Sequence, residues 1–407
     1  MINVKLIQKK IEYIMVSALK CFEPASRLKG IRPSGIHRMF ELAQGVPGMI
    51  SMGLGEPDYV PPIHVLEAIK QALDEGKTHY TPNEGVPELL EALAEKAKKD
   101  YGLIYDPETE IMITVGASEA IFLALLALVN PGDEVLIPDP GFAGYEPDVL
   151  MAGGVPISMP LLEEKDFRLD ANDVIPLLTG KSRVMIVNSP NNPTGSVLLY
   201  DDIMKLAKLV VERDLIVISD EVYEKITYDD TRHYCLATFP GMRERTLVVN
   251  SFSKTYAMTG LRVGYALGPK EVISSMVQVQ QFAVACVDGP AQYGAVAGLK
   301  GPQDFIDNMV REFDKRRHLL HSRINEIKGF RSTLPKGAFY LFANIQGFGM
   351  PSAQFAEHLF NKGKVVTVPG PVFGKYCEGY LRFSYATAYE KIEEALNRIE
   401  KAVKEIR

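Results

Sequence analysis

The sequence of 407 residues lacks several features that mark particular classes of protein. Its four cysteines, Cys21, Cys235, Cys286 and Cys377, lie far apart without a C-x-x-C pair. This spacing argues against a structural zinc site or a disulfide framework and favours a reducing, cytoplasmic location. The longest apolar run, 120–129, is far shorter than the ~20 residues that span a bilayer, so we expect no membrane partner. Lys and Arg total 45 against 51 Asp and Glu, and a net charge of −6 argues against a nucleic-acid binder.

What is present is ordinary for a globular protein, with 46% hydrophobic and 24% charged residues. The length favours two or three domains. The first residues resemble a signal peptide only in part, because Glu12 interrupts the apolar stretch and no small-x-small cleavage site follows. We therefore interpret residues 1–29 as an N-terminal extension or arm, and Met15 is an alternative start to Met1.

From residue 64 the chain alternates segments with helical and strand-like patterns. Helices are expected over residues 64–75, 87–99, 119–129, 201–212, 303–327 and 389–406, and strands over residues 111–115, 134–137, 184–187, 215–219 and 246–250. Each strand from 134 onward is a continuous Val/Ile/Leu-rich run, which is typical of strands that are covered on both faces. The order predicts an α/β fold with a mainly parallel, doubly wound sheet.

After about residue 300 the pattern changes to that of a smaller α+β domain. A charged helix comes first, and we expect its charged face to be solvated while Phe313, Leu319 and Leu320 point inward. Short strands, turns and the last helix follow. The predicted organisation is a large domain over residues 64–299 and a small domain that combines residues 30–63 with residues 300–407.

Ligands bind at the carboxyl ends of the strands in a doubly wound sheet. Small residues and Ser118 open a helix there, which suits an anion, although Ser118 could simply cap the helix. Asp220 ends one buried strand, where a carboxylate requires a cation or a hydrogen-bond donor as its partner. Lys254 follows another buried strand, where partial desolvation would lower its pKa and make it nucleophilic. An anion cradle, a carboxylate, a phenol, an amide and a lysine together suit pyridoxal 5′-phosphate.

The sequence resembles the class I/II aminotransferases of the pyridoxal-phosphate fold type I superfamily. The resemblance rests on an ordered set of motifs, namely GEPD (55–58), HYTP (79–82), NSPNNPTG (188–195), SDEVY (219–223), SFSKTYAMTGLRVGY (251–265), PKGAFY (335–340), VPGPVFG (368–374) and YLRFSYA (380–386). It extends from about residue 30 to the C-terminus. It implies a large domain that binds the cofactor and a smaller α+β domain.

The resemblance also implies roles for individual residues. Lys254 matches the lysine that forms a Schiff base with the cofactor and then moves the substrate α-proton. Asp220 matches the carboxylate that keeps the pyridine nitrogen protonated. Tyr223 and Asn192 match the pair that donates to the ring oxygen. Phe142 matches the aromatic ring over the pyridine, although ordinary core packing is an alternative for it.

Two further groups of residues follow from the same resemblance. The phosphate cup is matched by Ala117, Ser118, Ser251, Ser253 and Arg262, of which Ser253 could instead cap a turn. The substrate carboxylate site is matched by Gly55, Asn192 and Arg382. Tyr80 matches a tyrosine that reaches the phosphate of the neighbouring subunit, which implies a homodimer with a shared active site. No metal-ligand pattern is visible.

The implied activity is ping-pong transamination between an L-amino acid and a 2-oxo acid such as 2-oxoglutarate. Some relatives that use dicarboxylates have a second arginine after the lysine helix, but residues 271–299 contain no Lys or Arg. Basic residues of the arm could replace it, namely Arg27, Lys29, Arg32 and Arg38. Aspartate, aromatic or broad specificity therefore stays open.

Three other functions compete with transamination. A β-lyase or a ring-forming synthase on the same scaffold shares the cofactor residues. A pyridoxal-phosphate-binding regulator is disfavoured because the short N-terminal extension cannot form a DNA-binding module with its own core. A nicotinamide dehydrogenase is disfavoured because no strand is followed by G-x-G-x-x-G.

Overall fold

The computed structural model describes residues 24–31, 35 and 45–406. The chain divides into two compact units, Met1–Arg32 and Pro33–Arg407. The described part of the first unit holds one short 3₁₀ turn, Ser26–Leu28, whose residues are exposed. The second unit carries every element described below.

A seven-stranded sheet forms the centre of the second unit. Its order is β2-β8-β7-β6-β5-β3-β4. The strands are β2 (Ile111–Thr114), β3 (Glu134–Asp139), β4 (Val155–Pro160), β5 (Ser182–Asn188), β6 (Ile216–Asp220), β7 (Thr246–Ser251) and β8 (Gly264–Leu267). All neighbouring pairs are parallel except those of β8, which is antiparallel to both β2 and β7. The predicted α/β fold with a mainly parallel sheet is confirmed.

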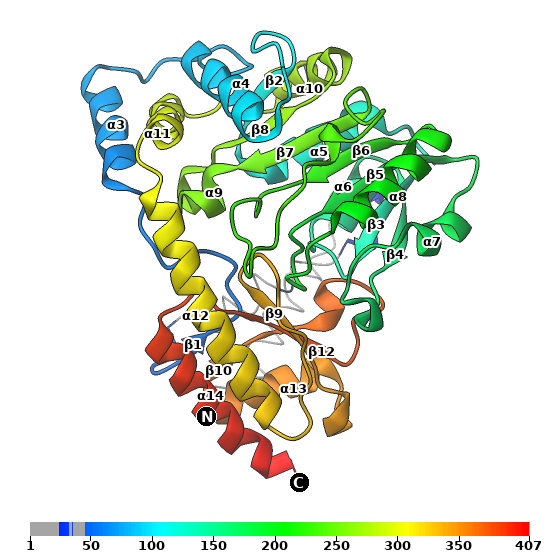
Figure 1. Cartoon of the computed structure of the whole chain (residues 1–407), viewed down its shortest axis with the longest axis vertical. Helices are drawn as coiled ribbons and strands as arrows, with labels where there is room; N and C mark the ends of the chain where they lie inside the picture. The colour runs from blue at the N-terminus through cyan, green and yellow to red at the C-terminus, as the bar shows by residue number, and fades with distance from the viewer. Residues whose placement is uncertain (1–23, 32–34, 36–44, 407) are drawn as a thin grey trace. The chain divides into compact units, whose positions relative to one another are not determined.

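Both faces of this sheet are covered, which explains why its strands lack alternation. In β5, Val184 and Ile186 pack in one cluster with the apolar residues of α5 (Gly116–Leu128). The intervening Met185 and Val187 pack in another cluster with residues of α8 (Tyr200–Glu212). Because successive side chains point to opposite faces, every position of such a strand must be apolar. The two helices can be followed in Figure 1.

Two smaller sheets lie outside the central sheet. One is antiparallel, in the order β11 (Val368–Pro369), β12 (Tyr380–Ser384) and β9 (Tyr340–Asn344), and the other pairs β1 (Ile50–Ser51) with β10 (Val365–Val366) in parallel. The other α-helices of the described residues are α3 (Ile63–Asp74), α4 (Pro87–Tyr101), α6 (Tyr145–Met151), α7 (Ala171–Val174), α9 (Phe252–Thr255), α10 (Lys270–Ala283), α11 (Gly289–Lys300), α12 (Asp304–Glu326), α13 (Ser352–His358) and α14 (Tyr389–Val403).

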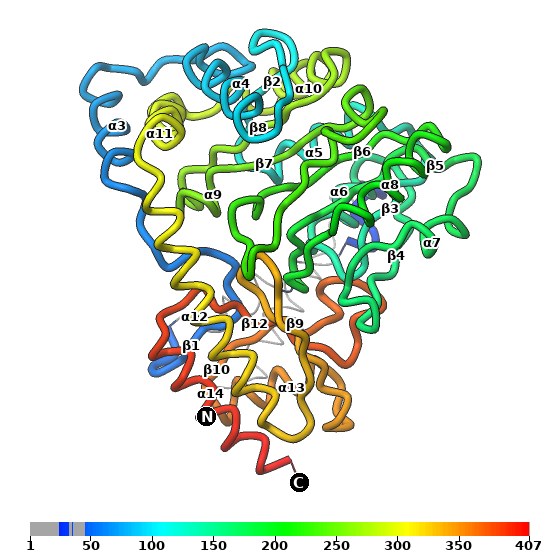
Figure 2. Tube along the Cα trace, in the orientation of Figure 1, coloured from blue at the N-terminus to red at the C-terminus, as the bar shows by residue number. Residues whose placement is uncertain are grey.

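One hydrophobic core joins the two ends of this unit. Ile50 and Met52 share a cluster with Phe383 of β12 and Leu396 of α14. The long helix α12 packs alongside α14, and Figure 2 traces both. This core brings the segment around residue 50 against the antiparallel sheet, and that arrangement positions the site described below.

The expectation of a fully solvated charged face on α12 is wrong. Phe313 and Leu320 are buried as expected and Leu319 is partly buried, but Arg316 and Arg317 are buried as well. Arg317 donates to Asp229 at 2.8 and 2.9 Å, and Arg316 donates to Asp58 at 2.8 Å. These carboxylates come from distant segments, so the pattern along one helix could not reveal them.

Two strands of the large sheet were not predicted. β8 runs against the strand–helix–strand order, and β4 is an edge strand whose residues are mostly half-buried. Neither carries the continuous apolar pattern that identified its neighbours. Across the described ranges, none of the helices combines the length and apolarity that crossing a membrane requires.

Candidate active site

Three strands of the large sheet end beside one another with polar residues. Asn188 at the end of β5 pairs with Asp220 at the end of β6, and the Asn188 Nδ2 donates to the Asp220 carbonyl oxygen at 3.0 Å. β7 lies next to β6, runs parallel to it and ends at Ser251. The parallel register therefore gathers three motifs, distant in the sequence, at one edge of the sheet.

Lys254 lies in α9, directly after β7. Ser251 caps this short helix, and its Oγ accepts a hydrogen bond from the Ser253 backbone N–H at 3.1 Å. The Lys254 Nζ donates to the Gly55 carbonyl oxygen at 2.6 Å. Burial lowers the pKa of Lys254 to about 8, against the opposing attraction of the Glu56 carboxylate. A lysine in this state is largely an ammonium at pH 7 but readily supplies a neutral amine.

Asp220 is a buried carboxylate beside this lysine. The Tyr145 hydroxyl donates to Asp220 Oδ2 at 2.6 Å, and the Val222 backbone N–H lies 3.4 Å from Oδ1. Burial raises the pKa of Asp220 to about 6, while the Tyr145 bond and the Lys254 charge oppose that rise. Asp220 is therefore mainly ionised at pH 7 and is available to a cationic partner.

Tyr223 is fully enclosed on the same turn as Asp220. Its hydroxyl lies 2.9 Å from the hydroxyl of Tyr340 in β9. Burial raises the pKa of Tyr223 well above its usual value, although the nearby Arg382 charge opposes the shift. Tyr223 is thus a neutral phenol and a hydrogen-bond donor at physiological pH.

Arg382 in β12 is a buried cation that is 1% exposed. Its Nη1 donates to Asn192 Oδ1 at 2.9 Å and its Nη2 donates to the Gly53 carbonyl oxygen at 2.6 Å. The guanidinium carbon lies 4.4 Å from the ring centroid of Tyr340 and 4.7 Å from that of Phe373. No carboxylate in the part of the chain that the structure describes pairs with Arg382, and its Nε has no partner there. Such a cation suits an external carboxylate.

An anion-binding corner lies where α5 begins. A Cβ on Gly116, the first residue of α5, would lie 2.5 Å from Arg262 Nη2, so this glycine admits the guanidinium. Arg262 Nη2 also donates to the Val115 carbonyl oxygen at 3.3 Å. A Cβ on Gly264 would lie 2.4 Å from the Gly116 carbonyl carbon. An arginine beside exposed helix N–H groups is a favourable place for a phosphate.

The remaining predicted residues lie in less defined positions. Ala117 and the exposed Ser118 stand in the first turn of α5, and Ser118 is not its N-cap, which is Val115 without a side-chain bond. Phe142 packs edge-on against Tyr145, with ring centroids 5.5 Å apart. Tyr80 is 89% exposed and has no described partner in this site.

The structure brings in three residues that the sequence analysis did not assign. Tyr145 donates to Asp220, Tyr340 contacts Tyr223 and Arg382, and Glu56 faces the Lys254 charge. Glu56 and Tyr340 lie within motifs that carried the resemblance, so the sequence marked their segments but assigned no function to these two side chains. Tyr145 is part of no motif recognised in the sequence.

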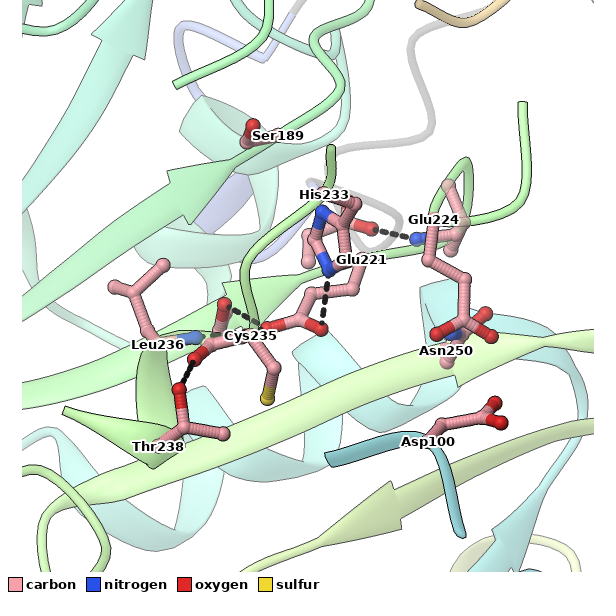
Figure 3. A network of polar contacts seen from close by, with 12 residues as sticks. Asp100, Ser189, Glu221, Glu224, His233, Cys235, Leu236, Thr238 and Asn250 are labelled. Atoms are coloured by element: carbon pink, nitrogen blue, oxygen red, sulfur yellow. Dashed lines mark hydrogen bonds and ion pairs between the residues drawn. The ribbon is translucent and has the colours of Figure 1, made fainter. Parts of the chain in front are cut away.

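A polar network anchors the turn that carries Asp220 and Tyr223 (Figure 3). The buried Glu221 carboxylate accepts a hydrogen bond from Ser219 Oγ at 2.8 Å and lies 2.9 Å from His233 Nε2. The Glu224 carboxylate pairs with the Lys96 ammonium at 2.7 Å. Ligand atoms of Glu221, Glu224 and His233 lie within 4.8 Å of one another, but Lys96 already supplies a cation there. We interpret the network as a structural anchor for the turn.

Comparison with known proteins agrees with this geometry. Residues 47–399 match the family described as aminotransferase class I and II. The aromatic-amino-acid aminotransferase 2 of Thermococcus litoralis is 46% identical over 94% of this chain and 98% of its own length. The aspartate aminotransferase of Pyrococcus abyssi is 47% identical over the same shares. The crystal structure of an aromatic aminotransferase from Pyrococcus horikoshii superposes with a TM-score of 0.86 at 48% identity, covering 91% of this chain and 99% of that one.

The sheet order, the partly buried Lys254 and the buried Arg382 together define a fold type I transferase. The chain belongs to the class I and II aminotransferase family. It is an enzyme that carries out transamination, as the sequence motifs predicted.

Proposed function

We propose that this transaminase uses pyridoxal 5′-phosphate bound to Lys254 and exchanges an amino group between an L-amino acid and a 2-oxo acid. The observation that carries the proposal is that a partly buried lysine of lowered pKa, Lys254, lies close enough to the buried, ionised Asp220 for their charges to interact. The neighbouring Arg382 is a buried cation that no described carboxylate neutralises. One site therefore offers an amine nucleophile, a carboxylate that can pair with a protonated ring nitrogen, and a cation that can bind the carboxylate of a substrate.

The residues present fit this cofactor. Lys254 is the amine for its aldehyde, and Asp220 is the acceptor for its ring nitrogen. Arg262 and the start of α5, with Ala117 and Ser118, form the proposed phosphate corner, and Ser251 and Ser253 complete it. Because residues 116 and 264 are glycines, Arg262 and the start of β8 can approach the start of α5 closely. When bound, the cofactor supplies an electron sink that stabilises negative charge at the substrate α-carbon.

The chain's own residues would then direct the proton. Lys254 takes the α-proton as a neutral amine and returns it as an ammonium, and its pKa near neutrality suits both directions. Asp220 stays ionised and holds a proton on the ring nitrogen. Tyr223 and Asn192 act as donors to the ring oxygen. Phe142, which packs on Tyr145 beside Asp220, is proposed to cover the ring face.

The proposed substrate grip consists of Arg382, Asn192 and Gly55. Arg382 supplies charge and a planar donor fork, and Asn192 fixes the fork through its Oδ1. We propose aspartate, aromatic amino acids or a broad range of both as amino donors, since the related enzymes are named for both aspartate and aromatic amino acids. Of the arm residues suggested for a second carboxylate, Arg32 and Arg38 lie outside the described residues.

We further propose a homodimer with a shared site, in which the exposed Tyr80 reaches the phosphate of the partner. The proposed domain division, 64–299 against 30–63 with 300–407, places Lys254 and Arg382 on different domains, so that closure excludes water. A cytoplasmic location is proposed because the described cysteines 235, 286 and 377 form no disulfide with one another.

The test is a screen of amino donors against 2-oxoglutarate with the cofactor-loaded enzyme. A transaminase consumes 2-oxoglutarate in a one-to-one ratio with the amino acid. A β-lyase instead forms pyruvate and ammonia without consuming 2-oxoglutarate, and that result would overturn the proposal. Lys254→Ala is the negative control, because it removes the amine that is proposed to bind the cofactor.

A further inference from the structure

Tyr340 touches three parts of the site and has no role in the function proposed above. Its hydroxyl lies 2.9 Å from the Tyr223 hydroxyl, and the Arg382 guanidinium lies over its ring at 4.4 Å. A Cβ on Gly55 would lie 2.5 Å from the Tyr340 oxygen, so the phenol also faces the loop whose carbonyl binds Lys254. Tyr340 is 1% exposed, so its side chain is enclosed by the protein and these contacts are part of the packed interior.

Resting on the proposed function, we propose that Tyr340 is a positioning residue that links the carboxylate grip of Arg382 to the ring donor Tyr223. The argument begins with the direction of the hydrogen bond between the two phenols. Tyr223 has a single hydroxyl proton. If that proton is donated to the cofactor's ring oxygen, Tyr340 must be the donor to Tyr223 across the 2.9 Å contact.

A chain of hydrogen bonds strengthens each of its members. Donation from Tyr340 therefore makes Tyr223 a stronger donor to the ring oxygen. A stronger donor stabilises the negative charge on that oxygen and lowers the pKa of the lysine-bound cofactor. Both phenols have raised pKa values because they are buried, so neither loses its proton at physiological pH.

The ring of Tyr340 has a second, separable task. Tyr340 and Phe342 project to one face of β9, and Arg382 stands opposite Phe342 in the antiparallel register. The Arg382 guanidinium therefore lies against the Tyr340 ring, with Phe373 as a second aromatic neighbour at 4.7 Å. Aromatic faces stabilise a desolvated cation and restrict its orientation. The ring holds Arg382, and the hydroxyl orients Tyr223.

Two substitutions in the cofactor-loaded enzyme separate these tasks. Tyr340→Phe keeps the ring, so the pKa in the visible absorbance titration should rise by about half a unit while the amino-acid KM changes less than about twofold. Tyr340→Leu removes the ring as well, so the same rise should be joined by a roughly tenfold higher KM. Tyr385→Phe is the matched control, because it removes another buried hydroxyl, one that donates to the Ala338 carbonyl at 3.2 Å.

Tyr385→Phe should change neither the absorbance pKa nor KM. A Tyr340→Phe enzyme that titrates like the wild type overturns the coupling, and so does a Tyr340→Leu enzyme with unchanged KM. If Tyr340→Phe does not fold, Gly55→Ala crowds the same hydroxyl and should raise the absorbance pKa alike. The proposed function itself predicts a visible cofactor absorbance in the wild-type protein that disappears in Lys254→Ala. If the wild-type protein lacks this absorbance, the proposed function is overturned, and that result is distinguishable from a failure of the Tyr340 proposal.

Discussion

The Nζ of Lys254 and the carbonyl oxygen of Gly55, 199 residues apart in the sequence, are joined by a hydrogen bond of 2.6 Å. Two residues earlier, the Gly53 carbonyl accepts from Arg382 at 2.6 Å. The short segment 53–55 therefore touches both the proposed amine and the proposed carboxylate grip. In the proposed function this segment keeps the amine and the carboxylate grip near each other, and such positioning favours reaction between a bound substrate and the amine.

The first prediction concerns the electrostatic partner of the cofactor ring. Asp220→Ala should lower kcat by roughly 10²–10³-fold or more, because a buried carboxylate that stabilises a ring cation is removed. Steady-state kinetics with a saturating amino donor measures it. Asp148→Asn is the control, since Asp148 is a half-buried carboxylate with no described hydrogen bond or ion pair to the proposed site residues, and it should keep kcat near the wild-type value. Full activity in Asp220→Ala would refute the assignment.

The second prediction concerns the carboxylate grip. Arg382→Ala should raise the amino-acid KM by roughly 10²-fold, because two charge-assisted hydrogen bonds to the substrate are lost. Arg382→Lys should recover part of this loss, since it restores charge without the planar fork. The cofactor absorbance should persist in both variants. An unchanged KM in Arg382→Ala would show that the carboxylate binds elsewhere.

The third prediction concerns the phosphate corner. Gly264→Ala should weaken cofactor retention by about tenfold or more, because the new Cβ would lie 2.4 Å from the Gly116 carbonyl carbon and displace the start of α5. Gly260→Ala is the matched control four residues away, where a Cβ meets no atom within 4 Å. Cofactor release during dialysis, followed by absorbance, compares the two. Equal retention in both variants would contradict the proposed corner.

The fourth prediction concerns pH and stability. Burial raises the pKa of Asp148 to about 7 from its ordinary value of 3.8. Between these values the folded protein binds more protons than the unfolded chain, so this group lowers stability as pH rises from about 4 to 7. Asp148→Asn should therefore raise Tm more at pH 8 than at pH 4. Thermal melts at both pH values measure it, and an equal change at the two would contradict the raised pKa.

The large sheet and its helices could be predicted closely because burial on both faces imposes a local pattern. The continuous apolar run 184–187 lies inside β5, and the helix expected over 201–212 is α8 with one residue added. β8 could not be predicted this way, since nothing in four residues shows that a strand runs antiparallel to its neighbours.

The positions of Lys254 and Asp220 could be predicted because each directly follows or ends a buried strand of one sheet, and their chemical roles stay predictions. The site could not be predicted where the task depends on a contact between distant segments. Tyr340 contacts Tyr223, which lies 117 positions away in the sequence. The buried Arg317 is paired with Asp229, which lies 88 positions away. Such contacts depend on the packing of whole elements, which no local pattern encodes.

The central claim, that Lys254 carries the cofactor, is tested most directly by borohydride reduction of the protein loaded with pyridoxal 5′-phosphate. Reduction fixes the imine as a stable amine, and peptide mass mapping then identifies the modified lysine. The account predicts the modification on the peptide that contains Lys254 and its complete loss in Lys254→Ala. Modification of a different lysine in the wild-type protein, or persistence of the modification in Lys254→Ala, would contradict it.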